Sequence, residues 1–118
     1  MKSKTLVLKF GGTSVGSIER IKAVSKIILS HKSKNTKIAV VSSAMSGVTN
    51  ELIKKSKSIS NNFDSAEYDA LLSTGEQVAC ALIAGNLKAL GHNSRSWLSW
   101  QLPIMTEGQH SNSRISNI

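Results

Sequence analysis

The sequence predicts an α/β protein built on a mainly parallel sheet. Two short apolar segments, Thr5–Phe10 and Ile38–Val41, carry largely continuous hydrophobic residues, which is typical of parallel strands covered on both faces. Each segment runs into a loop of small residues, and each loop is followed by a stretch with helical spacing. Strand, loop and helix repeated twice is the element order of an open parallel sheet, whose ligands gather at the carboxyl ends of the strands.

The first helix has a clear start. Ser17 stands where an N-cap belongs, and Glu19 suits the positive end of the first turn. Apolar residues follow at helical spacing, at Ile18, Ile21, Val24 and Ile28. We expect this helix to end between Ser30 and Ser33.

Two further helices are predicted after the second strand. The first is expected to be capped by Thr49 or Asn50 and to carry Leu52, Ile53 and Ile59. After a loop at residues 61–64, the second runs from Ser65 to about Leu90, with Gly91 ending it and Gly75 marking a kink. Its core-facing residues are expected to be Leu71, Val78, Leu82 and Leu90.

The remainder of the chain gives weaker signals. Ser96–Ser99 and Ile104–Thr106 are candidate short strands. Residues 111–118 contain no recognisable closing element, so we expect a domain that is cut short.

Length and composition exclude several classes. With 118 residues the chain suits one domain at most, and its single cysteine, Cys80, excludes a disulfide scaffold or a multi-cysteine metal site. No apolar stretch approaches the roughly 18–20 residues of a membrane span. The apolar part of the N-terminal segment is interrupted by Lys9 and no cleavage site follows, which argues against a signal peptide. We expect a cytoplasmic protein.

The formal charge of +8 raises nucleic-acid binding as an alternative. The lysines, however, are spread over two separate segments, and the few aromatic residues are not interleaved with them as a stacking platform requires. Solvated helix faces explain this distribution better, and a phosphate-bearing small ligand can still use one or two lysines.

The segment Lys9–Ser14, with sequence KFGGTS, carries the strongest chemical signal. Two glycines after a strand allow close backbone approach to a ligand, and successive N–H groups can form an anion-binding nest. Lys9 can place a positive charge against phosphate oxygens. The lysine precedes the glycines, so this is not a Walker A loop, and a plain tight turn remains the alternative.

Three segments together are similar to the N-terminal part of the aspartokinases, which have the amino-acid-kinase fold. They are KFGGTSVGS, VVSSAMSGVTNEL and ALLSTGEQVACALI, and the tail WQLPIMTEGQHSNSRI resembles the family's next segment. The resemblance implies a three-layer αβα sandwich with a mainly parallel sheet. It also implies that residues 1–118 are the N-terminal part of the kinase domain, without its C-terminal nucleotide-binding half or the ACT regulatory modules.

The resemblance implies transfer of the ATP γ-phosphoryl group to the β-carboxylate of L-aspartate, with Mg²⁺ bound alongside the nucleotide. The product, 4-phospho-L-aspartate, leads to lysine through diaminopimelate, and to threonine and methionine. A carboxylate nucleophile is already ionised at neutral pH, so no general base is needed. The scattered histidines, His31, His92 and His110, are compatible with this chemistry.

Site roles are likewise implied by the resemblance. Lys9 would be the catalytic residue, and the ATP-binding residues would be Lys9, Phe10, Gly11, Gly12 and Ser43. Thr49 and Glu76 would bind aspartate. The alternatives are a plain N-cap for Thr49, a strand end for Ser43 and a solvated helical position for Glu76.

Residues outside these motifs are expected to be structural. Cys80 lies among apolar residues and is expected to be a small buried residue, not a reactive thiol. Trp97 and Trp100 are expected to pack or to lie partly exposed.

Three hypotheses follow for the chain as a whole. It is an inactive N-terminal piece of an aspartokinase, one subunit of a split enzyme completed by a second polypeptide, or a small basic nucleic-acid-binding protein. A homo-oligomer or a complementing C-terminal polypeptide is the expected assembly.

Overall fold

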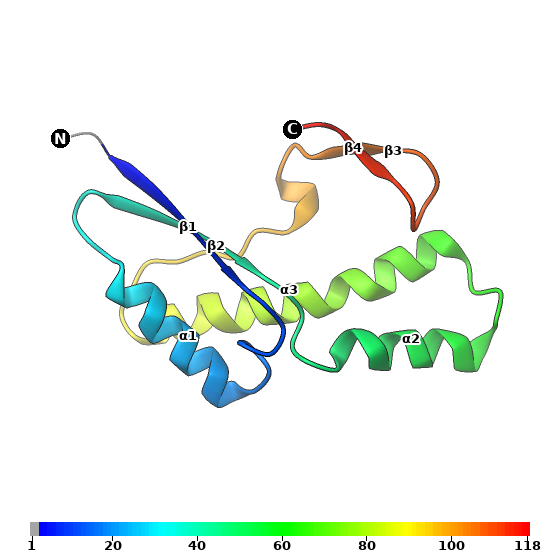
Figure 1. Ribbon diagram of the computed structural model, residues 1–118, viewed down its shortest axis with the longest axis horizontal. Coiled ribbons are helices and arrows are strands. Elements are labelled where there is room, and N and C mark those ends of the chain that lie inside the picture. Colours follow the sequence, from blue (N-terminus) through cyan, green and yellow to red (C-terminus); the bar gives the residue numbers. More distant parts are fainter. Residues whose placement is uncertain (1–2) are drawn as a thin grey trace.

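A computed structural model describes residues 3–118 and contains two small sheets with three helices (Figure 1). Strands β1 (Lys4–Phe10) and β2 (Thr36–Ser42) pair in parallel from Lys4 opposite Thr36 to Phe10 opposite Ser42. Helix α1 (Ile18–Ser30) connects them. This β–α–β unit confirms the α/β class with a parallel sheet.

Helix α1 begins as the sequence predicts. Ser17 has extended backbone angles, and its side chain accepts a hydrogen bond from the N–H of Arg20 at 3.2 Å. Glu19 lies in the first turn, where a hydrogen bond from its own backbone N–H, and then one from the Ser17 hydroxyl, lower the pKa of its carboxyl. The helix ends at Ser30, within the expected range.

The sheet is covered on one face only, which differs from the expectation of strands buried on both faces. Leu6, Leu8 and Phe10 turn toward the helices, whereas Val7 on the other face is 62% exposed. Strand side chains alternate between the two faces, and α1 and α3 lie on the same side of the sheet (Figure 1). The continuous apolar run therefore leaves one apolar face open within the described chain.

Helix α2 (Val48–Ile59) starts two or three residues earlier than the predicted caps imply. Its N-cap is Gly47, with a φ of 83°, so the prediction of Thr49 or Asn50 as the cap is wrong. The loop enters the helix through a left-handed conformation that glycine adopts without strain. Thr49 consequently lies inside the first turn, and Ile59 at the far end is exposed.

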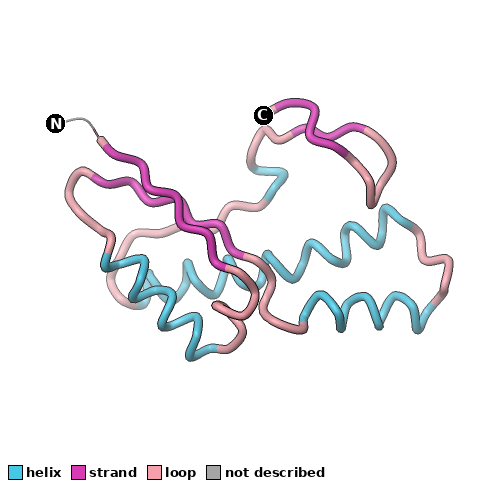
Figure 2. Tube along the Cα trace, viewed as in Figure 1, coloured by secondary structure: helices cyan, strands magenta, loops and turns pink. Residues whose placement is uncertain are grey.

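Helix α3 (Ser65–Ala89) is the longest element and runs antiparallel beside α2 (Figure 2). Asp64 caps its start by accepting from the N–H of Glu67 at 3.0 Å. At its end, Gly91 takes a φ of 84° and donates to the carbonyl of Lys88, while His92 donates to the carbonyl of Leu87. This is a Schellman termination, and it confirms Gly91 as the stop.

The main core joins the sheet, α1 and the second half of α3. It contains Phe10, Val15, Ile21, Val24, Ile28, Ile83 and Leu87. The inward face of α3 repeats every four residues, at Gly75, Ala79, Ile83 and Leu87. The predicted inward face is wrong for Val78 and Leu90, which are half exposed. Leu82 packs against the core as predicted, although it is only partly buried, and Leu71 is partly buried outside this cluster.

The helix runs through Gly75 as one element. One polar link crosses the core, where the fully buried Ser25 accepts from the side-chain amide of Asn86 at 2.8 Å. The same Ser25 hydroxyl donates to the carbonyl of Ile21.

The C-terminal part departs most from expectation. Residues 93–98 form no strand, and a short 3₁₀ helix covers Ser99–Gln101, so the predicted strand at Ser96–Ser99 is wrong. Strand β3 (Met105–Glu107) confirms the second predicted strand within a residue. It pairs antiparallel with β4 (Arg114–Asn117), a strand that the sequence analysis did not predict. Within residues 3–118, no helix is long and apolar enough to cross a bilayer.

Candidate functional site

The loop after β1 is held by two short-range turns. The N–H of Ser14 donates to the carbonyl of Gly11 at 3.0 Å, and that of Gly16 to Thr13 at 3.4 Å. Among residues 3–118, the N–H groups of Gly12 and Thr13 have no backbone or side-chain acceptor. Two neighbouring donors of this kind can serve an anion.

The loop after β2, residues 43–47, is hydrogen-bonded to the first loop. Ser43 donates its N–H to the carbonyl of Phe10 at 3.0 Å, and Ser46 donates to the carbonyl of Gly12 at 3.1 Å. Both loops leave the carboxyl ends of adjacent parallel strands, where ligands of open α/β sheets bind. The two segments predicted as separate motifs thus form one structural unit.

Gly12 is required by this contact. A Cβ at Gly12 would lie 2.9 Å from the carbonyl oxygen of Ala44, closer than real Cβ atoms approach backbone. Gly11 is different, since a Cβ there would meet nothing within 4 Å. The first glycine therefore leaves open space at the loop, and the second allows the two loops to touch.

Gly75 brings α3 against the same loops. A Cβ at Gly75 would lie 2.9 Å from the Cβ of Ala44 and 3.4 Å from Cγ1 of Val48. Ala44 is buried and lies between the first loop and α3. Because Glu76 and Thr49 directly follow Gly75 and Val48, this packing fixes the backbone that carries both predicted aspartate-binding residues.

Lys9 lies on the open face of the sheet, two residues before the glycine pair. It is opposite Val41 in the register and is exposed. No ion pair involves it among the residues that the structure describes. Its neighbour Phe10 points the other way and is 9% exposed in the core, so only the Phe10 backbone faces the loops.

The remaining predicted site residues differ in burial. Ser43 and Thr49 are half-buried, and Glu76 is exposed on α3. No ion pair engages Glu76 within the described chain. Hydrogen bonds join Ser43 to Phe10 and Ser46 to Gly12. Thr49 and Glu76 are the sequence neighbours of Val48 and Gly75, which pack together at Ala44.

Sequence reasoning missed Ala44, the residue on which the two loops and α3 converge. The sequence did contain one sign of this contact, Gly75 inside α3. We interpreted it as a kink, whereas in the structure it allows α3 to pack closely against Ala44.

Cys80 lies one turn beyond Glu76. Burial raises the pKa of its thiol, the charge of Glu76 raises it further, and a hydrogen bond with the Ser42 backbone opposes both. A thiol kept protonated is a poor nucleophile. This agrees with the expectation of an unreactive residue, although Cys80 is only partly buried.

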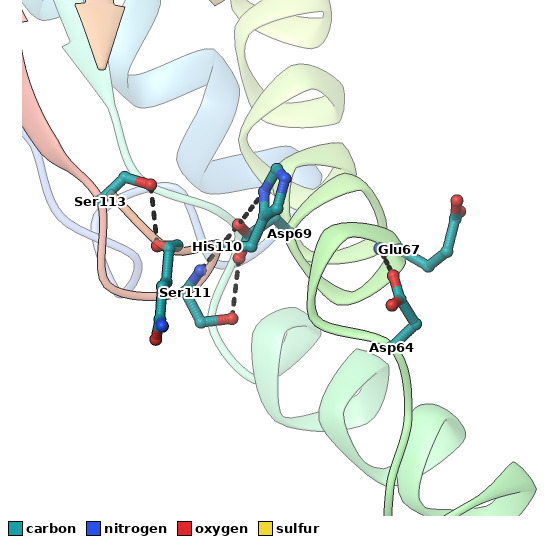
Figure 3. A network of polar contacts seen from close by, with 7 residues as sticks. Asp64, Glu67, Asp69, His110, Ser111 and Ser113 are labelled. Carbon is teal, nitrogen blue, oxygen red and sulfur yellow. Dashed lines mark hydrogen bonds and ion pairs between the residues drawn. The ribbon is translucent and has the colours of Figure 1, made fainter. Parts of the chain in front are cut away.

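A second polar cluster joins α3 to the β3–β4 hairpin (Figure 3). Asp69 Oδ2 accepts from the N–H of Ser111 at 2.8 Å and lies 3.2 Å from Nδ1 of His110, while Oδ1 accepts from the Ser111 hydroxyl at 3.1 Å. The Ser111 N–H, more than the other groups, lowers the pKa of the Asp69 carboxyl. These contacts fix the hairpin turn to the first half of α3.

Metal ligands do not gather in the part of the chain that the structure describes. Among residues 3–118, no three His, Cys, Asp or Glu side chains lie close enough together to hold an ion. Trp97 and Trp100 are half exposed or more, and the Arg95 guanidinium stacks 4.0 Å from the centroid of the Trp97 ring.

Comparison with known proteins points to one family. The model of the amino acid kinase family matches residues 4–118. An aspartokinase of Geobacillus stearothermophilus is 49% identical over 113 residues, and aspartokinase 2 of Bacillus subtilis is 42% identical over 113 residues. Each alignment covers 96% of this chain but 28% of the relative. The chain therefore spans less than a third of the length of the curated relatives it matches.

A solved structure agrees with the sequence matches. The crystal structure of aspartate kinase from Synechocystis superposes with a TM-score of 0.69 at 44% identity, covering 73% of this chain and 15% of that one. The resemblance to aspartokinases and the α/β fold class are thereby confirmed.

Proposed function

This chain belongs to the amino acid kinase family, and we propose that it is the N-terminal part of an aspartokinase domain. In this proposal the C-terminal nucleotide-binding half and the ACT modules belong to a further stretch of polypeptide. The proposal is supported by the similarity of 96% of the chain to a segment that makes up 28% of its bacterial relatives.

The reaction is transfer of the γ-phosphoryl group from ATP to the β-carboxylate of L-aspartate. A carboxylate oxygen forms the new P–O bond, the bond from the γ-phosphorus to the bridging oxygen breaks, and ADP leaves. Because the aspartate carboxylate is ionised at neutral pH, the residues need only position the substrates and stabilise charge. The product is 4-phospho-L-aspartate, the precursor of lysine, threonine and methionine.

Lys9 would neutralise the charge that develops on the transferred phosphoryl group. Its position at the carboxyl end of β1, with no ion-pair partner in the described chain, leaves the ammonium group available for phosphate oxygens. The backbone at Phe10, Gly11 and Gly12 would contact the phosphates.

The free N–H groups at Gly12 and Thr13 and the open space at Gly11 suit a nucleotide phosphate. Ser43, joined to the first loop through the Phe10 carbonyl, would line the nucleotide side. When bound with the nucleotide, Mg²⁺ would neutralise phosphate charge. In this proposal the ion would be bound together with ATP.

Thr49 and Glu76 would bind L-aspartate. Thr49 lies in the first turn of α2, whose N-terminal end favours a carboxylate, and Glu76 would pair with the α-ammonium group. The observation that carries the proposal is the contact of Ala44 with both Gly12 and Gly75, because it brings the phosphate loop and these two helices to one place.

The test is ATP-dependent formation of aspartyl hydroxamate by the purified chain. It is assayed alone and after co-expression with the part of the G. stearothermophilus aspartokinase that the alignment with this chain does not include. The proposal expects no activity from the chain alone and activity from the pair. A soluble pair that binds neither ATP nor aspartate would refute it.

A further inference from the structure

A cavity of about 730 Å³ lies along the edge of β2 that faces away from β1. Its walls are β2, the second half of α3 and the segment after α3, which turns back beside β2 (Figure 1). Most of the lining is apolar, with Ile38 and Val40 on β2 and Ile83 and Leu87 on α3. This volume and this lining are typical of a small-molecule site.

The cavity extends along β2 between two different ends. At one end the Nζ of Lys32 lies 2.9 Å from Nδ1 of His92, and the backbone N–H of His92 donates to the carbonyl of Leu87. At the other end Cys80 lies against the backbone of Ser42. The rise of α3 from Cys80 to Leu87 is about 10 Å. An extended alkyl chain of medium length fits between the two ends.

The Lys32 end of the cavity is positively charged. An ammonium group has no lone pair, so Lys32 donates to Nδ1 of a neutral His92 and keeps two further N–H bonds for a ligand. Arg95, whose guanidinium stacks on Trp97, adds a second positive charge to the wall. Among residues 3–118, no Asp or Glu lines the cavity, and neither Lys32 nor Arg95 has an ion-pair partner.

The opposite end has the opposite electrostatic character. The negative charge of Glu76 acts there and raises the pKa of the Cys80 thiol. An anionic group in the cavity is therefore favoured at the Lys32 end and disfavoured at the Cys80 end. The wall formed by the segment after α3 is fixed in place, because the Ser94 hydroxyl donates to the carbonyl of Ala84 at 2.7 Å.

We propose that this cavity binds an amphipathic carboxylate, with its carboxylate at Lys32 and its alkyl chain between β2 and α3. The carboxylate accepts charge-assisted hydrogen bonds from the Lys32 ammonium group, which His92 holds at the cavity. The alkyl chain lies against Ile38, Val40 and Ile83. None of the residues assigned above to ATP or aspartate lines the cavity, so this site is independent of the proposed function.

Fluorescence titration of the full 118-residue chain with decanoate tests the proposal. Trp97 lines the cavity, whereas Trp100 does not, so Trp100→Phe leaves a single reporter. We expect a saturable change in Trp97 emission with one decanoate bound per chain. Decanol has the same alkyl chain without the charge, and it should bind at least about tenfold more weakly because it lacks the charge-assisted hydrogen bonds.

Two further variants, made in the same background, locate the two parts of the ligand. Lys32→Gln should weaken decanoate binding about tenfold and leave decanol binding unchanged. Lys26→Gln is the matched control, because Lys26 is an exposed lysine of α1 outside the cavity, and decanoate affinity should not change. Ala84→Phe places a large side chain in the cavity and should abolish the binding of both probes.

Several results would overturn the proposal. They are the absence of saturable decanoate binding, equal affinities for decanoate and decanol, equal effects of Lys32→Gln and Lys26→Gln, and the uptake of several decanoate molecules per chain. The last would indicate general adsorption of amphiphiles. Circular dichroism checks that each variant folds. If Ala84→Phe does not fold, the comparison of Lys32→Gln with Lys26→Gln still decides.

Discussion

Gly75 of α3 lies so close to Ala44 that a Cβ on the glycine would be 2.9 Å from the alanine methyl group. The carbonyl oxygen of Ala44 lies at the same distance, 2.9 Å, from the place that a Cβ on Gly12 would occupy. The two glycines lie more than sixty residues apart and meet on one small residue. The geometry of the candidate site depends on this contact.

Gly75→Ala is expected to destabilise the chain. The helix propensity of alanine would favour folding by about 1 kcal/mol, but the added methyl group forces Ala44 and Val48 to move, which typically costs about 1–3 kcal/mol. Gly85→Ala in the same helix is the control, because a Cβ there meets nothing within 4 Å and stability should rise by up to ~1 kcal/mol. Urea unfolding measures both. Equal stabilisation of the two variants would contradict the close packing at Gly75.

Gly12→Ala is expected to separate the two loops, because the new methyl group meets the backbone of Ala44. The amide of Ser46, which donates to the Gly12 carbonyl, should then exchange its hydrogen faster than in the wild type. Gly11→Ala, with open space around it, should leave that exchange rate unchanged. Unchanged protection of Ser46 in Gly12→Ala would show that the loops are not held together by this contact.

Acid is expected to release the β3–β4 hairpin from α3. The folded-state pKa of Asp69 is lowered, first by the Ser111 N–H, so the stabilisation is present above the ordinary carboxyl pKa and is lost as the pH falls through the lowered value. Protection of the Ser111 amide against hydrogen exchange should therefore decline below about pH 4. Asp69→Asn should lose much of this protection already at neutral pH.

Asp64→Asn is the control for Asp69→Asn. Asp64 caps the same helix, and asparagine caps about as well as aspartate, so this variant should keep the wild-type protection of Ser111. Protection of Ser111 that does not depend on Asp69 would contradict the assignment.

Cys80 is expected to react slowly with alkylating reagents in the folded chain. Burial and the charge of Glu76 raise its pKa, so little thiolate forms near pH 8. Iodoacetamide should modify the native chain more slowly than the urea-unfolded chain. Equal rates would indicate a solvated, unshifted thiol.

Local signals in the sequence predicted the start and end of several elements. Ser17 caps α1 and Gly91 ends α3, because each termination depends on a few neighbouring residues. The pairing of two parallel strands around a helix followed from the repeated strand, loop and helix order. The loop sequences and their resemblance to aspartokinases predicted the family.

Contacts between distant segments could not be predicted in the same way. The inward face of α3 follows Gly75, Ala79, Ile83 and Leu87, because a small residue at 75 is needed against Ala44, whereas hydrophobicity alone favoured Val78. The backbone of Gly47 sets the start of α2, overriding the stronger side-chain caps that follow it. The open face of the sheet could not be predicted from the sequence. A continuous apolar strand predicts two covered faces, whether or not the layer that covers the second face is part of the described chain.

The central claim is that Lys9 acts on the phosphoryl group at the edge of the glycine loop. The most direct measurement is aspartyl hydroxamate formation by the co-expressed pair carrying Lys9→Ala, beside Lys4→Ala, which removes an exposed lysine at the other end of the same strand. We predict that Lys9→Ala lowers kcat at least about 1,000-fold, with an unchanged urea midpoint and an intact complex, and that Lys4→Ala retains activity. Wild-type kcat in a folded Lys9→Ala complex would contradict the account.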